Sequence, residues 1–183
     1  MNAGKSCMSP YYLIVHADIY EKFLVELEKA YYRFFPKDQD IRDNPDYADV
    51  IHERHADKLR AVLAETIAAG AKPIIGGGPG EGAHLPPAIL RDVQPDHPIM
   101  QDEIFGPISP ILKYNDLDEA LALIHRIEKP LGLYIFSRKS SAIKRVIQHT
   151  SSGSVVVNDT PIAFAHTEVP FGGVYFSGIG KAH

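Results

Sequence analysis

Cysteine, excess positive charge and long apolar runs are all scarce or missing in this 183-residue chain. Its single cysteine, Cys7, cannot form an internal disulfide, so we expect a reducing compartment, the cytoplasm. A formal net charge of −4 gives no electrostatic reason to expect a nucleic-acid partner. No stretch reaches the roughly 18 apolar residues of a membrane-spanning helix, and no charged-then-apolar leader is seen, so neither membrane insertion nor secretion is expected.

The remaining composition is that of an ordinary globular protein, with 45% hydrophobic and 23% charged residues. This length is typical of one domain with a substantial core. We find no internal repeat and no linker. The sequence therefore predicts a single domain over residues 1–183.

Short apolar runs rich in β-formers alternate with segments of helical periodicity. Because strands and helices alternate, we predict an α/β fold with a mostly parallel open sheet and flanking helices. The predicted strands are 11–16, 72–75, 88–93, 108–114, 131–137 and 154–158. The predicted helices are 18–34, one or two between 45 and 69, one beginning at 116, and 140–150.

Several residues indicate where the helices begin, where one strand lies in the sheet and which side chains face the core. Asp18, Asn44 and Asp116 are expected to cap helices, and Pro110 suggests that strand 108–114 is an edge strand or carries a bulge. Ile147 is expected to point inward from the last helix. The inward face of helix 18–34 is predicted to contain Ile19, Phe23, Leu27, Ala30, Tyr31 and Phe34.

A glycine-rich segment, residues 76–82, has the composition of a phosphate-binding loop. Such loops open directly into a helix whose amino end holds the anion. Here the glycines run into Leu85-Pro86-Pro87, which cannot continue as a helix, so we predict a surface turn.

Two short segments carry the candidate chemistry. The first, Asn2-Ala3-Gly4-Lys5-Ser6-Cys7, resembles the nucleophile segment Asn-Ala-Gly-Gln-x-Cys of the aldehyde dehydrogenases, with Lys5 in place of glutamine. The second, Glu103-Ile104-Phe105-Gly106-Pro107, resembles the E-x-F-G-P signature of the same family. Later segments match in the family's order, and the class 3 and fungal fatty-aldehyde branches look most similar. They are 128–134, 150–159 and 170–180.

The resemblance implies a role for each matched residue. Cys7 would be the nucleophile, with Asn2 and Lys5 beside it. Glu103 would hold the nicotinamide ribose hydroxyls and Phe105 would pack beside the nicotinamide.

By the same resemblance, the C-terminal part of the chain would supply residues that face the substrate. Asn158 would lie on the loop that faces the substrate, and His166 or Glu168 could reach Cys7 as a base. Tyr175 and Phe176 stand where the family has glycine and a small residue, so they could close the pocket.

The chemistry of a thiol explains why such a site needs Cys7. The thiolate adds to an aldehyde carbon and forms a thiohemiacetal, which divides one difficult step into easier ones. An ordinary free thiol is mostly protonated at neutral pH and needs activation. Lys5 could favour the thiolate or could point to solvent, and the backbone N–H of Cys7 could donate to the developing oxyanion.

The nucleotide-binding domain of the family precedes the nucleophile, whereas Cys7 follows only six residues here. We therefore expect a truncated, catalytic-domain-only chain that lacks most cofactor contacts. Glu103 and Phe105 would be vestigial cofactor contacts. No cofactor is expected to bind, and NAD(P) would bind only if the missing domain were supplied.

Three functions are compatible with these features. The leading hypothesis is a cysteine-dependent enzyme that needs no redox cofactor. Its thiol would add reversibly to an aldehyde or conjugated carbonyl compound and allow double-bond isomerisation or cyclisation. The second is a catalytic fragment of an NAD(P)-dependent aldehyde dehydrogenase that oxidises aldehyde to acid. The third is a non-catalytic relic that binds a partner protein through an exposed apolar face.

Metal binding is not expected. His52-x-x-His55 has only two ligands, whereas zinc sites need three or four. The expected partner is a small carbonyl substrate, and self-association into a homo-oligomer is compatible with the sequence.

Overall fold

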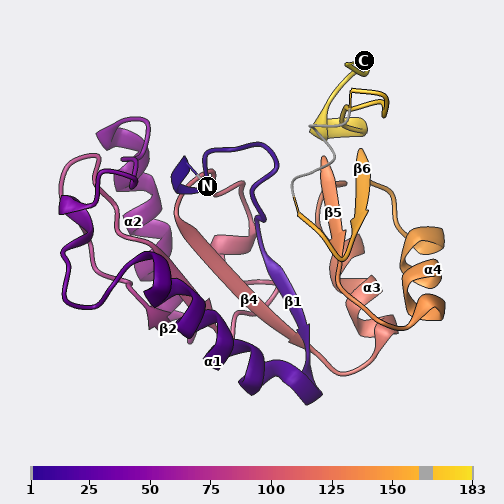
Figure 1. Ribbon diagram of the computed structural model, residues 1–183, viewed down its shortest axis with the longest axis horizontal. Coiled ribbons are helices and arrows are strands. Elements are labelled where there is room, and N and C mark those ends of the chain that lie inside the picture. The colour runs from indigo at the N-terminus through magenta and orange to yellow at the C-terminus, as the bar shows by residue number, and fades with distance from the viewer. Residues whose placement is uncertain (1, 161–166, 183) are drawn as a thin grey trace. The chain divides into compact units, whose positions relative to one another are not determined.

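The structure is a computed structural model that describes residues 2–160 and 167–182. The chain forms two compact units, Met1–Asn115 and Asp116–His183, and each is described here by itself (Figure 1). The single domain expected from the sequence stays a prediction.

A four-stranded sheet organises the first unit. Its strands are β1 (Leu13–His16), β2 (Lys72–Ile75), β3 (Ala88–Arg91) and β4 (Ile108–Tyr114), in the order β1-β4-β3-β2. Both β1 and β3 run parallel to β4, while β2 is antiparallel to β3. The predicted α/β fold with a mostly parallel sheet is therefore confirmed.

The prediction of β4 as an edge strand is wrong, because β4 is an inner strand with neighbours on both sides. Pro110 is nevertheless buried within it. Residues 108–110 pair with β3 and residues 111–114 pair with β1. Pro110 thus lies where β4 changes partner, a position at which a missing N–H interrupts neither run of pairs.

Helix α1 (Ala17–Phe34) covers one face of this sheet. Its N-cap is His16, whose Nδ1 accepts from the backbone N–H of Asp18 at 3.2 Å. Asp18 was expected to be the cap but lies in the first turn. The predicted end at Phe34, just before Pro36, is confirmed.

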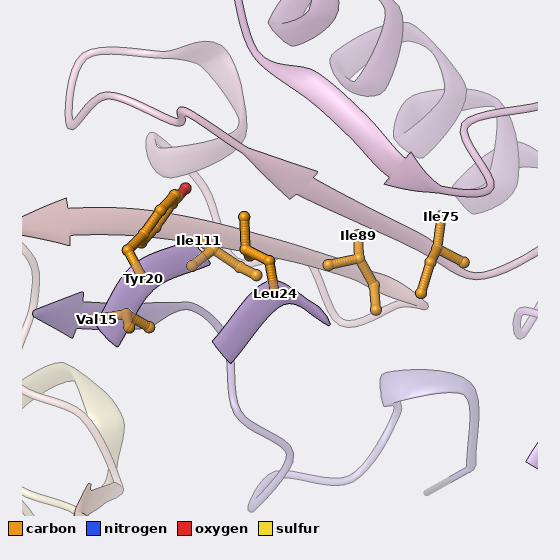
Figure 2. Packing of buried hydrophobic residues seen from close by; sticks show 6 residues of the cluster. All are labelled: Val15, Tyr20, Leu24, Ile75, Ile89 and Ile111. Atoms are coloured by element: carbon orange, nitrogen blue, oxygen red, sulfur yellow. The ribbon is translucent and has the colours of Figure 1, made fainter. Parts of the chain in front are cut away.

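The buried face of α1 differs from the predicted one. Tyr20 and Leu24 are its buried residues and pack against Ile111, Ile89 and Ile75 of the sheet (Figure 2). Burial of each such side chain stabilises the fold by roughly 2 kcal/mol. Of the six predicted inward residues, Phe23, Leu27, Ala30 and Tyr31 are partly buried, whereas Ile19 and Phe34 are exposed.

Helix α2 (Glu53–Ala68) follows a long loop that contains the short 3-10 helix η2 (Ile41–Asp43). Of the one or two helices predicted between residues 45 and 69, one is present, α2, but none begins at Pro45, because Asn44 caps a turn by accepting from the N–H of Asp46. The N-cap of α2 is His52, whose Nδ1 accepts from the N–H of His55 at 3.0 Å. Two further 3-10 helices, η1 (Asn2–Gly4) and η3 (Pro98–Met100), complete this unit. The glycine-rich segment 76–82 contains no helix, as predicted.

The second unit has a parallel pair of strands, β5 (Gly132–Ile135) and β6 (Ser154–Val157), with helices α3 (Leu117–His125) and α4 (Ser140–His149). The core of this unit contains Leu121, Ile135 and Val146. The predicted cap of α3 is confirmed, because Asp116 Oδ1 accepts from two backbone N–H groups of the first turn. Ile147 is 45% exposed, so its predicted inward orientation is wrong.

Within residues 2–160 and 167–182, no helix combines the length and apolar character needed to cross a membrane.

Candidate active site

The two segments with candidate chemistry meet at one edge of the first sheet. Cys7 lies just before β1, and the turn Asp102–Gly106 lies just before β4. Since β1 and β4 are adjacent and parallel, their amino ends lie at the same edge. The topology therefore brings the cysteine loop and the Glu103 turn together.

A close backbone contact joins these two segments. A Cβ atom on Gly4 would lie 2.0 Å from the carbonyl oxygen of Gly106, so only glycine fits there. Gly4 also has a φ of +73°, a left-handed conformation that favours glycine. Asn2 and Ala3 share this left-handed region, each with a φ of 46°. The amino-terminal turn is thus wound tightly and packs directly on Gly106.

The thiol of Cys7 is free and exposed. The next residue, Met8, is buried, and the N–H of Ser9 donates to the carbonyl of Ser6 at 2.9 Å. Within the described residues, the backbone N–H of Cys7 donates no hydrogen bond. The exposed sulfur and an N–H donor that has no partner among the described residues therefore lie on one tight turn.

Lys5 anchors this loop. Its ammonium donates to the backbone carbonyl of Asp49, whose carboxylate pairs with Nδ1 of His84 at 2.9 Å. No hydrogen bond links Lys5 to Cys7 in the described part of the chain. Lys5 therefore attaches the loop to the segment before α2, and activation of the thiol by Lys5 stays a prediction.

One face of α2 holds the turn that carries Glu103. His55 Nε2 donates to the carbonyl of Phe105 at 3.1 Å, and Lys58 Nζ lies 2.9 Å from the carboxylate of Asp102. Leu59 packs on Gly106, where an added Cβ would lie 2.4 Å from its Cδ1 atom. Three residues spaced i, i+3 and i+4 thus hold a turn in which Phe105 has a φ of 43°.

Glu103 and Phe105 themselves are open to a ligand. Glu103 is exposed and forms no hydrogen bond or ion pair with the described residues. The side chain of Phe105 is 38% exposed. Both groups predicted to touch a nicotinamide nucleotide are therefore unobstructed within their own unit.

Tyr11 connects the cysteine loop to the same turn from the other side of Cys7. Its hydroxyl donates to the backbone carbonyl of Asp102, and the carbonyl of Ile99 lies 3.5 Å away. Burial raises the pKa of Tyr11 to about 12, with smaller contributions from Tyr12 and from the carboxylates of Asp102 and Glu103.

Sequence reasoning missed both Tyr11 and His55 as residues that support the site. Tyr11 was assigned only to a strand, and His55 was considered only as a metal ligand. In the described residues, no three His, Cys, Asp or Glu side chains are grouped to hold a metal ion.

Asn158, in the second unit, has a structural role. Its Oδ1 accepts from the N–H of Ser137 at 2.9 Å, and its Nδ2 donates to the carbonyl of Ser137 at 3.1 Å. With a φ of 57°, Asn158 closes the ends of β5 and β6. Its role beside a substrate stays a prediction.

The other predicted residues of this unit are exposed or not described. Glu168 is exposed, and His166 lies outside the described residues. Tyr175 and Phe176, in the 3-10 helix η5 (Tyr175–Ser177), are 71% and 87% exposed. The Lys129 ammonium lies 3.7 Å from the centroid of the Tyr175 ring, a cation–π contact. That these rings close a pocket also stays a prediction.

The family model for the aldehyde dehydrogenase family matches residues 1–183, so this chain belongs to that family. Aldehyde dehydrogenases depend on NAD(P), and an aldehyde substrate fits the family.

Its similar proteins are larger than this chain. The chain is 40% identical to a 4,4'-diaponeurosporen-aldehyde dehydrogenase of Staphylococcus aureus, with all of the chain and 39% of that protein covered. It is also 40% identical to aldehyde dehydrogenase family 3 member A2 of Mus musculus, covering 37% of that protein. A solved structure of Staphylococcus aureus AldH in a substrate-bound state superposes with a TM-score of 0.91 and 38% identity, covering 99% of this chain and 39% of the other.

This chain spans about two fifths of the length of these relatives. The resemblance to class 3 enzymes is confirmed by the family 3 relative. These relatives come from a bacterium and a mammal, so they do not support the fungal branch.

Proposed function

We propose that this chain carries the thiol-bearing part of an aldehyde-oxidising site and that Cys7 is its nucleophile. The observation that carries the proposal is the exposed Cys7 turn, packed through Gly4 on the turn of Glu103. Membership of the aldehyde dehydrogenase family supports the same substrate class.

In the proposed reaction, the Cys7 sulfur forms a bond to the aldehyde carbon. The π electrons of the carbonyl move to its oxygen, and the free backbone N–H of Cys7 donates to the developing oxyanion. Removing one such donor from other enzymes costs roughly 3 kcal/mol of transition-state stabilisation. The tight turn 2–9 prepares this donor before the substrate arrives, because its orientation is fixed by the fold.

The residues of this chain also fit one side of a nicotinamide nucleotide. Glu103 offers ribose hydroxyls an exposed carboxylate that forms no ion pair with the residues the structure describes, and Phe105 offers an exposed ring to a flat heterocycle. When bound, this cofactor supplies the hydride acceptor that aldehyde oxidation requires. The role of Glu103 and Phe105 is to bind and orient it beside the carbon held by Cys7.

A second candidate is the redox-free conversion of a conjugated carbonyl compound. It is favoured by the same exposed thiol, because addition of sulfur to an enal turns a double bond into a rotatable single bond. Elimination then gives the other isomer. Incubating the chain with an enal and no nicotinamide separates this function from oxidation: isomerised product that Cys7→Ala does not form supports it, and unchanged enal rejects it.

Protection of Cys7 from alkylation tests the main proposal. The probe is an aldehyde in which a saturated alkyl chain separates an aromatic ring from the carbonyl group. It should slow labelling of Cys7 by iodoacetamide, while the corresponding alcohol should not, because only the aldehyde can form the thiohemiacetal. The peptide that contains Cys7 is followed by mass spectrometry. Equal labelling with aldehyde and with alcohol rejects the proposal, and a thiol that iodoacetamide never labels favours the partner-binding role instead.

A further inference from the structure

Cys7 lies between two points at which its loop is attached to the same turn. Gly4, on one side, packs against the backbone of Gly106. Tyr11, on the other side, donates to the backbone carbonyl of Asp102. Both ends of the turn Asp102–Gly106 are thus joined to the loop that presents the thiol.

We propose that Tyr11 is a positioning residue whose hydroxyl fixes the Cys7 loop against the turn that carries Glu103. This inference rests on the proposed function of Cys7. The contact at Gly4 is packing alone, and Lys5 attaches the loop to Asp49, so neither contact is a hydrogen bond to the turn Asp102–Gly106. The hydrogen bond of Tyr11 is directional and resists separation of the loop from this turn.

The bond has the features of a lasting constraint. The tyrosine side chain is partly buried, and its acceptor residue, Asp102, is adjacent to Glu103 in the sequence. The second carbonyl nearby is that of Ile99, a buried residue of η3. Loss of the hydroxyl would leave the Asp102 carbonyl without this partner and would loosen the attachment of residues 7–11 to the turn, while the buried Met8 still holds the loop to the fold.

If Tyr11 positions the loop, its removal should affect the two reactions of Cys7, addition to a carbonyl and alkylation, differently. Addition of sulfur to a carbonyl develops an oxyanion and needs the N–H of Cys7 in the correct direction. Displacement of iodide from iodoacetamide develops no oxyanion and needs only an accessible thiol. A loop that is loosened but still exposed should therefore lose the first reaction and retain the second.

Tyr11→Phe and Tyr12→Phe form a matched pair for the experiment. Both remove one hydroxyl from adjacent, partly buried rings, and the Tyr12 hydroxyl makes no hydrogen bond within the described residues. The carbonyl reaction is a single turnover of p-nitrophenyl acetate, in which Cys7 sulfur gains the acetyl group and p-nitrophenolate leaves. Alkylation by iodoacetamide and hydrogen exchange of residues 102–106 are measured on the same variants.

We expect Tyr11→Phe to slow acyl transfer about fivefold or more, with alkylation within twofold of the unsubstituted chain and faster hydrogen exchange at 102–106. Tyr12→Phe should change none of these. Equal ratios of acylation to alkylation in the two variants, or unchanged exchange in Tyr11→Phe, would overturn the positioning role alone. If Cys7 of the unsubstituted chain reacts with neither reagent, the proposed function fails and the role of Tyr11 fails with it.

Discussion

Replacement of Gly4 by alanine should separate the cysteine loop from the Glu103 turn. The added methyl group would lie 2.0 Å from the Gly106 carbonyl oxygen and 2.6 Å from its carbon. Both are backbone atoms, so no side-chain rotation can relieve the overlap. The loop or the turn must move.

The expected cost has two parts. An alanine at a φ of +73° loses about 1–2 kcal/mol relative to glycine. Overpacking against a fixed backbone adds about 1–3 kcal/mol, limited by the free energy that attaches the loop. Gly82→Ala is the matched control, because Gly82 has a φ of +56° and a Cβ there would meet nothing within 4 Å. Gly82→Ala should therefore show only the cost of placing alanine in a left-handed backbone conformation.

Urea unfolding and Cys7 acylation together measure the two parts. Gly82→Ala should lower the free energy of unfolding by about 1–2 kcal/mol and leave acylation unchanged. Gly4→Ala should lower it by about 2–5 kcal/mol and slow acylation by tenfold or more, because the Cys7 N–H loses its fixed direction. Equal stability and equal acylation in the two variants would refute the claim that Gly4 packs on Gly106.

Three further changes test single contacts. The pKa of Tyr11 is raised from 10.0 to about 12, so its contribution to stability is complete below pH 10 and is lost as pH rises toward 12. Urea unfolding at successive pH values measures the loss of unfolding free energy between pH 10 and pH 12. This loss should be smaller in Tyr11→Phe than in the unsubstituted chain by up to about 2 kcal/mol. His55→Leu deletes the donor to the Phe105 carbonyl and should lower the unfolding free energy by about 1 kcal/mol, with faster hydrogen exchange at Phe105 and Gly106. Asn158→Ala loses two hydrogen bonds and the residue type that best tolerates a φ of 57°, so urea unfolding should show a loss of about 2 kcal/mol that Asn158→Gly partly restores.

Local patterns predicted most elements of the fold. Strands at 72–75 and 108–114 were predicted with their observed bounds, because β-rich runs bounded by turn residues leave few alternatives. The buried face of α1 was harder to predict, because Ile19 and Tyr20 are both apolar and only packing against the sheet determines that Tyr20 is the buried one. The sequence order of strands also did not reveal that β4 is an inner strand, so Pro110 was taken to mark an edge strand or a bulge.

The candidate site was predictable only as two separate motifs. Cys7 and the Glu103 segment were identified from their resemblance to the family, but their contact depends on the parallel pairing of β1 with β4. The packing of Gly4 on Gly106 and the bond from Tyr11 to Asp102 join residues far apart in sequence. No periodicity or spacing signals such contacts.

Single-turnover release of p-nitrophenolate from p-nitrophenyl acetate tests most directly whether Cys7 adds to a carbonyl carbon. We expect about one p-nitrophenolate per chain, with the acetyl group on the peptide that contains Cys7, and no such release from Cys7→Ala. Acetylation of other residues only, or equal release from both chains, would contradict the assignment of Cys7 as the nucleophile.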